Sequence, residues 1–219
     1  MASGLARPRT SRSYIGSVFR LILVLPALAI AACRSAGPQA QGATGVTPAQ
    51  EARDELQHPR FTAAGVQFAS GMISHHAQAI VMAGWAPTHD ASPAVRDLCK
   101  RIAVSQTDEI TFMQNWLRVR HQTVPPADTM PGMPMSGMLM PGMLTAEQLA
   151  ELDRARGPGF DRLFLTDMIQ HHRGAIEMVH QLESSGQGED DALMIYATNV
   201  EADQSAEIGR MQRMLASQH

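Results

Sequence analysis

Apolar side chains recur every three or four residues along most of the chain beyond residue 49, and no stretch alternates apolar and polar residues as a strand does. This spacing predicts an all-α fold. Prolines and capping residues set the expected bounds, with Pro87 as a stop and Thr145 and Gln148 as a capping box. The predicted helices are 49–56, Pro59 to about Trp85, Pro93 to about His121, 146–152, about Pro158 to Ser184, and about Asp190 to Ala216.

The helical pattern occurs twice in the chain, as an internal sequence repeat. "GMISHHAQAIVMA" at 71–83 returns as "DMIQHHRGAIEMV" at 167–179, 96 residues later, and "QTDEITFM" at 106–113 returns as "QSAEIGRM" at 204–211. Each half, about 59–121 and 158–217, is therefore predicted to be a helical hairpin. A single hairpin exposes an apolar stripe that only the other can cover, so we expect a four-helix bundle.

The linker between the halves, residues 122–157, begins with a segment that cannot form regular structure. Residues 122–144 hold five prolines and three glycines. The same segment carries six methionines, Met130, Met133, Met135, Met138, Met140 and Met143. Two interpretations stay open: the thioethers gather Cu(I), or they lie across the bundle as an adaptable apolar lid.

The N-terminal residues predict export. Residues 1–33 combine a basic stretch with a short apolar run, "LILVLPALAIAA", and end in "IAAC", as in a bacterial lipoprotein signal with Cys33 as the lipidated residue. Ordinary secretion and an uncleaved anchor are the alternatives. Residues 34–49 then form a flexible tether, and residues 50–219 a single domain that works outside the cytoplasm, held at the membrane through the lipid.

Composition and charge exclude several classes of function. Four of the 18 basic residues and none of the 21 acidic ones lie in the leader, which leaves the rest with a formal charge of −7. Nothing in that balance favours nucleic acid. Cys99 is the one cysteine besides Cys33 and is expected to be a small buried apolar residue, and no Gly-x-Ser-x-Gly motif suggests a nucleophilic enzyme.

Each half places histidines and methionines on the buried face of one helix. At about 100° per residue these side chains fall within about 120° of the helix surface. The second helix of each hairpin carries a glutamate in its apolar stripe, which would cost several kcal/mol if buried without a partner. We therefore expect the glutamates to pair with the histidines. The residues are His75, His76, Met72, Met82 and Glu109 in the first half, and His171, His172, Met168, Met178 and Glu207 in the second.

These residue types are those of a transition-metal site, although a purely structural His–Glu network remains the alternative. Imidazole suits copper, zinc, nickel and iron, whereas thioether sulfur suits Cu(I), so copper fits the set best. A diiron carboxylate bundle would use Glu-x-x-His motifs, and the sequence has none.

The repeated motifs resemble those of the bacterial extracytoplasmic proteins grouped as domain of unknown function 305. The resemblance rests on "MISHHAQAIVMA", "FDRLFLTDMIQHHRGAIEMV" and the two Gln-to-Met segments, and covers about residues 59–217. It implies a ferritin-like four-helix fold. Some members are periplasmic copper-binding proteins, so the resemblance also implies His75, His76, His171 and His172 with their flanking methionines as candidate ligands.

Three functions follow from these observations. The first is a binding protein that sequesters copper or hands it on, in exchange with a donor or acceptor protein that the sequence does not identify. The second is an enzyme in which the same cluster holds a redox metal and oxidises Cu(I) or handles peroxide. The third is a structural bundle that needs no metal; in that case we expect His171→Ala to leave Glu207 unpaired.

Overall fold

The computed structural model describes residues 61–126, 139–185 and 191–217, together with residues 47, 49, 50 and 53. The described part is all helical and contains no strand. Its helices are α2 (Ala63–Gly84), α3 (Pro93–Val119), α4 (Ala146–Arg154), α5 (Pro158–Ser184) and α6 (Asp191–Ala216). The predicted all-α fold is confirmed.

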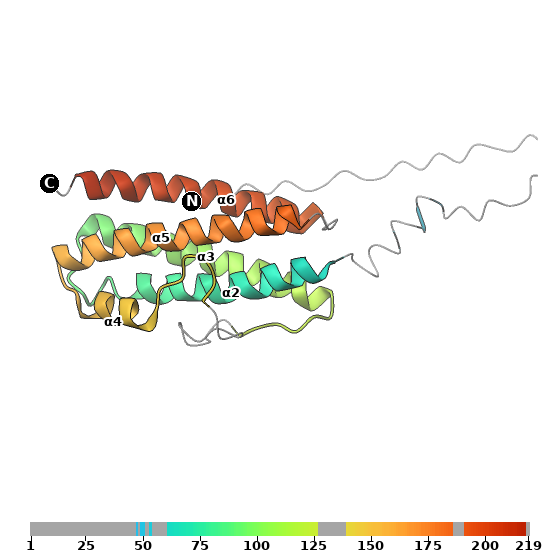
Figure 1. Ribbon diagram of the computed structural model, residues 1–219, viewed down its shortest axis with the longest axis horizontal. Helices are drawn as coiled ribbons and strands as arrows, with labels where there is room; N and C mark the ends of the chain where they lie inside the picture. Colours follow the sequence, from blue (N-terminus) through green and yellow to red (C-terminus); the bar gives the residue numbers. More distant parts are fainter. Residues whose placement is uncertain are drawn as a thin grey trace, which may run out of the picture. The chain divides into compact units, whose positions relative to one another are not determined.

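The four long helices form two hairpins, as the repeat predicts. α2 packs against α3, and α5 packs against α6 (Figure 1). α2 and α5 join the hairpins along a shared seam, in which the two helices run in opposite directions (Figure 1). α4 contacts the ends of both seam helices, and it belongs to the crossover that connects one hairpin to the other. The result is a four-helix bundle.

Most helix bounds agree with the expected ones because capping residues set them. Thr145 and Gln148 form the capping box of α4, and the Ser92 hydroxyl accepts from the Val95 amide ahead of Pro93. The start predicted at Pro59 is wrong. Thr62 has an extended backbone and its hydroxyl accepts from the Gly65 amide at 3.0 Å, so α2 begins at Ala63.

The hydrophobic core consists of two clusters of buried side chains. The first contains Met82, Ile102, Phe164 and Met168; the second contains Met72, Met113, Ala175 and Val179, among others. Among the buried residues of α5, the change from one cluster to the other falls at the His-His pair, and on α2 it falls just after the pair, between Ala77 and Ala79. A polar layer therefore divides the core, and we call His75, His76, His171 and His172 the histidine layer.

The N-terminal predictions fall on residues that the structure does not describe. The signal peptide, Cys33 and the tether lie outside the described residues, as does most of the helix predicted over 49–56, of which Ala49, Gln50 and Arg53 are helical. Among the described residues, no helix has the length and apolar character needed to span a membrane. The proposed domain limits stay predictions.

Candidate metal centre

The two helices of the α2–α5 seam bring the four motif histidines together in the bundle interior. All four side chains are fully buried. The rings of His75 and His171, one from each repeat, lie against each other across the seam in a tilted arrangement, with centroids 3.8 Å apart and an interplanar angle of 39°. The ring centroids of His75 and His76 are 6.3 Å apart, and those of His171 and His172 are also 6.3 Å apart. The four imidazoles therefore form one continuous layer rather than two separate sites.

The outer histidines of the layer each pair with a glutamate within their own hairpin. His76 Nε2 lies 2.5 Å from Glu109 Oε2, and His172 Nε2 lies 2.6 Å from Glu207 Oε2. The predicted pairing of histidine and glutamate is confirmed. One detail is wrong: His172, not His171, is the partner of Glu207, because the α5–α6 register brings His172 to that carboxylate.

One central histidine is held by the backbone of the crossover. His75 Nε2 lies 3.0 Å from the carbonyl oxygen of Pro141. A carbonyl only accepts, so Nε2 must carry the proton and Nδ1 must present its lone pair when the ring is neutral. His76 and His172 also use Nε2 toward their acceptors, so the bonded nitrogen is the same in all three rings.

The opposite ring nitrogens have no hydrogen-bond partner among the described residues. They are Nδ1 of His75, His76 and His172, and both nitrogens of His171. Buried polar atoms are normally satisfied, so a group of orphaned nitrogens in one layer needs an explanation. A metal-ligating histidine has this arrangement, because it donates from one nitrogen to a carboxylate or carbonyl and offers the other to the ion.

The electrostatics of the layer keep its central rings neutral. Burial, assisted by the neighbouring histidines, lowers the pKa of His75 to about 3 and holds the pKa of His171 well below 6.5. Burial would raise the pKa of Glu109, but hydrogen bonds from His76 and Ser105 outweigh it, and that pKa lies below its ordinary value. Neutral imidazoles beside a carboxylate are the form in which these residues bind metals.

The residue types fit a transition-metal ion, but their lone pairs do not converge. Among the residues that the structure describes, no three His, Cys, Asp or Glu side chains are arranged to hold an ion. A ligand lone pair lies in the plane of its imidazole ring, and the His75 and His171 rings lie against each other at a tilt of 39°, with their centroids 3.8 Å apart. Binding at the layer therefore requires at least one central ring to turn.

The chain matches the sequence model of a known protein family. The family whose sequence model matches the chain is described as a domain of unknown function, DUF305, and the match spans residues 65–215. The chain belongs to the DUF305 family. No curated protein matches it.

Solved structures of DUF305 proteins have the same bundle. A DUF305 fragment from Deinococcus radiodurans is 27% identical, with a TM-score of 0.63 over 73% of this chain and 99% of that one. A Streptomyces coelicolor DUF305 protein, named as a candidate secreted protein, is 28% identical, with a TM-score of 0.60 over 70% and 93%. CopM in its Cu(II)-bound form is 26% identical, with a TM-score of 0.58 over 71% and 97%. CopM also has a Cu(I)-bound form.

The predicted methionine ligands of this DUF305 protein lie on both sides of the histidine layer. Met72, Met82 and Met168 are fully buried, and Met178 is 8% exposed. They pack in the two hydrophobic clusters, Met82 and Met168 in the first, Met72 and Met178 in the second. The ordinary role of core filler thus accounts for their burial, and a role as ligands stays a prediction.

Two of the six linker methionines are described, and both pack on the bundle. Met143 is buried, and the Sδ atom of Met140 comes within 3.1 Å of the point where a Cβ would stand on Gly71, with Met178 Cε at 3.4 Å from the same point. Met130, Met133, Met135 and Met138 lie outside the described residues. The described end of the methionine segment therefore reaches the α2–α5 seam.

Several buried polar residues were not singled out by the sequence. Asp161 accepts from the Ser92 amide at the start of α3 at 3.1 Å. His89 is buried and donates to the Asp153 carbonyl at 2.8 Å. Gln78 makes two bonds to Leu144. These partners are 64 to 69 residues apart, and no local pattern reveals them.

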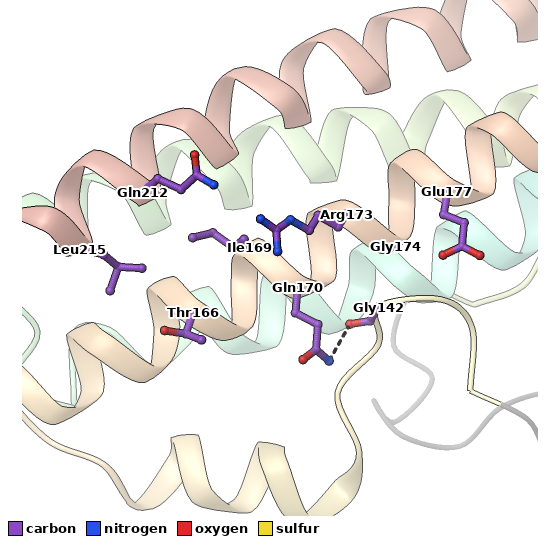
Figure 2. Close-up of a pocket in the computed structure, with 9 residues that line it drawn as sticks. All are labelled: Gly142, Thr166, Ile169, Gln170, Arg173, Gly174, Glu177, Gln212 and Leu215. Atoms are coloured by element: carbon purple, nitrogen blue, oxygen red, sulfur yellow. Dashed lines mark hydrogen bonds between the residues drawn. The ribbon is translucent and has the colours of Figure 1, made fainter.

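A surface pocket of about 590 Å³ lies outside the histidine layer. Figure 2 shows it along the outer side of α5, with residues of α6 and the crossover at its margins. None of the candidate ligands lines it. The lining residues are Gly142, Thr166, Ile169, Gln170, Arg173, Gly174, Glu177, Gln212 and Leu215.

Proposed function

We propose that this DUF305 protein binds copper outside the cytoplasm, where it sequesters the ion or hands it on, and that the histidine layer is its principal site. One observation carries the proposal: four fully buried histidines from two repeats meet in one layer, and each has at least one ring nitrogen without a hydrogen-bond partner among the described residues. The copper-bound forms of CopM support the choice of metal.

The layer and its surroundings offer ligands for both oxidation states of copper. Imidazole nitrogens beside Glu109 and Glu207 suit Cu(II), whereas the thioethers of Met72 and Met168 would complete a softer set for Cu(I). The methionine segment of the crossover supplies a second soft site in this proposal, because Met140 Sδ and Met178 Cε both lie within 3.4 Å of the point where a Cβ on Gly71 would stand. Capture by thioethers followed by transfer to imidazoles is consistent with this placement.

The test is a competitive titration of the purified chain with Cu(I) and with Cu(II). We expect tight binding that is lost when His75 and His171 are both replaced by Asn, with circular dichroism to verify folding. His180→Ala is the matched control, because His180 lies on α5 but is 55% exposed and pairs with Glu201. It should leave binding unchanged.

Each other outcome rejects part of the proposal. Binding that survives in the folded double variant would show that His75 and His171 are not required, and binding that also survives when His76 and His172 are replaced would place the copper site in the methionine segment. If Cu(I) and Cu(II) fail to bind the native chain, the histidine layer is a structural His–Glu network, which is the alternative that the sequence left open.

The localisation belongs to the same proposal. Cys33 is proposed as the lipidated N-terminal residue of the mature chain, supported by the "IAAC" sequence and by the secreted description of the Streptomyces coelicolor relative. Incorporation of labelled palmitate in a bacterial host, abolished by Cys33→Ser, tests it. Release of the unlabelled native chain into the soluble fraction would contradict it.

A further inference from the structure

A single segment of the crossover covers the histidine layer along the α2–α5 seam. This segment, residues 139–145, is called the strap. Met140 packs against the second hydrophobic cluster, whereas Leu144 is fully buried in the first, so the strap crosses the level at which the histidines divide the core. The Pro141 carbonyl, between them in sequence, is the group that accepts from His75.

Equivalent positions of the two repeats hold the strap by different contacts, one through a side chain and the other through the absence of one. Gln78 and Gly174 are 96 residues apart, each three residues after a central histidine. On α2, the Gln78 side chain donates to the Leu144 carbonyl at 3.1 Å and accepts from the Leu144 amide at 2.8 Å. On α5, Gly174 has no side chain, and the strap backbone lies directly against it.

The contact at Gly174 leaves no room for a larger residue. A Cβ on Gly174 would stand 2.0 Å from the Pro141 carbonyl oxygen and 2.5 Å from the Gly142 Cα. Gly142 itself has φ +73°, a left-handed conformation that favours glycine. Figure 2 shows Gly142 beside α5, where the Gln170 amide donates to its carbonyl at 3.4 Å.

The strap therefore breaks the symmetry of the duplicated centre. It supplies a carbonyl to His75, whereas neither ring nitrogen of His171, the equivalent residue of the other repeat, makes a hydrogen bond of normal geometry among the described residues, although the His75 backbone lies near enough to act on its pKa. A neutral imidazole with one nitrogen fixed as a donor has a single tautomer, whereas one with two unpartnered nitrogens is free to exchange.

We propose that Pro141 is a positioning residue for the metal centre: its carbonyl, held in place by Gly174 and Gln78, fixes His75 to present Nδ1, while His171 remains the adjustable ligand that turns to meet the ion. The inference about copper affinity rests on the proposed function. The inference about the two tautomers does not, because it concerns the chain without copper.

The decisive experiment replaces Gly174 by Ala and reads the histidine tautomers by ¹⁵N NMR in chelated, copper-free protein at pH 7. In the native chain we expect His75 to show a single tautomer protonated at Nε2, and His171 to show an exchange average. In Gly174→Ala the strap must move away from α5, so His75 should lose its single-tautomer signature. Gly84→Ala is the matched control, because a Cβ there meets nothing within 4 Å.

Copper affinity is measured on the same variants. Loss of a group that orients a ligating histidine typically lowers metal affinity by about 10–100-fold, and we expect a decrease of that size for Gly174→Ala and none for Gly84→Ala. If the native chain binds no copper but the tautomers behave as expected, the proposed function fails, and what stands is that the Pro141 carbonyl fixes the tautomer of His75 and leaves that of His171 free.

A second variant keeps the proposal testable if Gly174→Ala does not fold. Gln78→Leu removes both bonds to Leu144 while leaving Gly174 unchanged, so it releases the strap from the α2 side. It should give the same change in the His75 signal. A folded variant of either kind in which His75 keeps its Nε2–H tautomer would overturn the proposal, as would a native spectrum in which His75 and His171 are alike.

Discussion

The rings of His75 and His171 contact each other in the interior of the bundle, with centroids 3.8 Å apart and both side chains fully buried. Two imidazoles in this position cannot both carry a charge at an acceptable cost, because burial and their mutual repulsion disfavour protonation. The contact joins the two repeats, and it links the stability of the bundle to the protonation of its candidate metal ligands.

The copper-free protein should therefore lose stability in mild acid. The unfolded chain protonates such a ring near pH 6.5, whereas the folded state does so for His75 only near pH 3, so unfolding takes up protons between these values. The lowered pKa of Glu109 acts in the same direction below about pH 4.5. Each pKa unit is worth about 1.4 kcal/mol, so the free energy of unfolding should fall by several kcal/mol between pH 6.5 and pH 3.5 through His75.

Urea unfolding from pH 8 to pH 3.5, with a chelator present, measures this effect. The free energy of unfolding should be level above pH 7 and fall steadily below it. A His180→Ala control should follow the native curve. A free energy that does not change between pH 7 and pH 5 would show that the buried rings are not held neutral.

His172 and Glu207 should be energetically coupled, whereas His171 and Glu207 should not. A double-mutant cycle between His172→Ala and Glu207→Ala is expected to give about 1–3 kcal/mol, because either single change leaves a partly buried polar partner unsatisfied. The parallel cycle with His171→Ala tests the pairing expected from sequence. Equal coupling energies in the two cycles would contradict the hydrogen bond described above.

Asp161→Ala should destabilise the bundle by about 1–3 kcal/mol. The Asp161 carboxylate is buried and accepts from the Ser92 amide at the start of α3, so its removal leaves a buried donor unpaired. Thermal and urea unfolding provide the measurement. Asp97→Ala is the control, because Asp97 is exposed in a surface pair with Lys100 and should change the stability little. Similar losses in the two variants would refute the role given to Asp161.

Cys99 should be unreactive in the folded protein. Its side chain is buried without a disulfide, and burial together with the Asp161 charge raises the pKa of the thiol to about 12. In a Cys33→Ser background, a thiol reagent at pH 8 should label Cys99 only after denaturant is added. Rapid labelling of the native chain would mean that this end of the bundle opens readily, and addition of copper should not alter the result.

The sequence determined the elements and the composition of the candidate site. The 3.6-residue period, Pro93, Pro158 and Thr145 set the helices, and a repeat of 96 residues implied two hairpins that cover each other. Burial of all four motif histidines followed from their helix face. These are local properties, because a residue's place on a helix face depends only on its spacing from its neighbours.

The tertiary structure decided which groups meet. Whether Glu207 reaches His171 or His172 depends on the register between α5 and α6. A shift of one residue would change the partner, although the pattern of apolar residues along each helix would stay the same. The strap has no periodic signal, and its bonds join residues 66 apart. Gln78 and Gly174 occupy equivalent positions in the repeat, but only the packed seam shows that one holds the strap by hydrogen bonds and the other by close backbone contact. The strap offers the Pro141 carbonyl to His75 and not to His171, because one segment cannot contact two equivalent histidines in the same way.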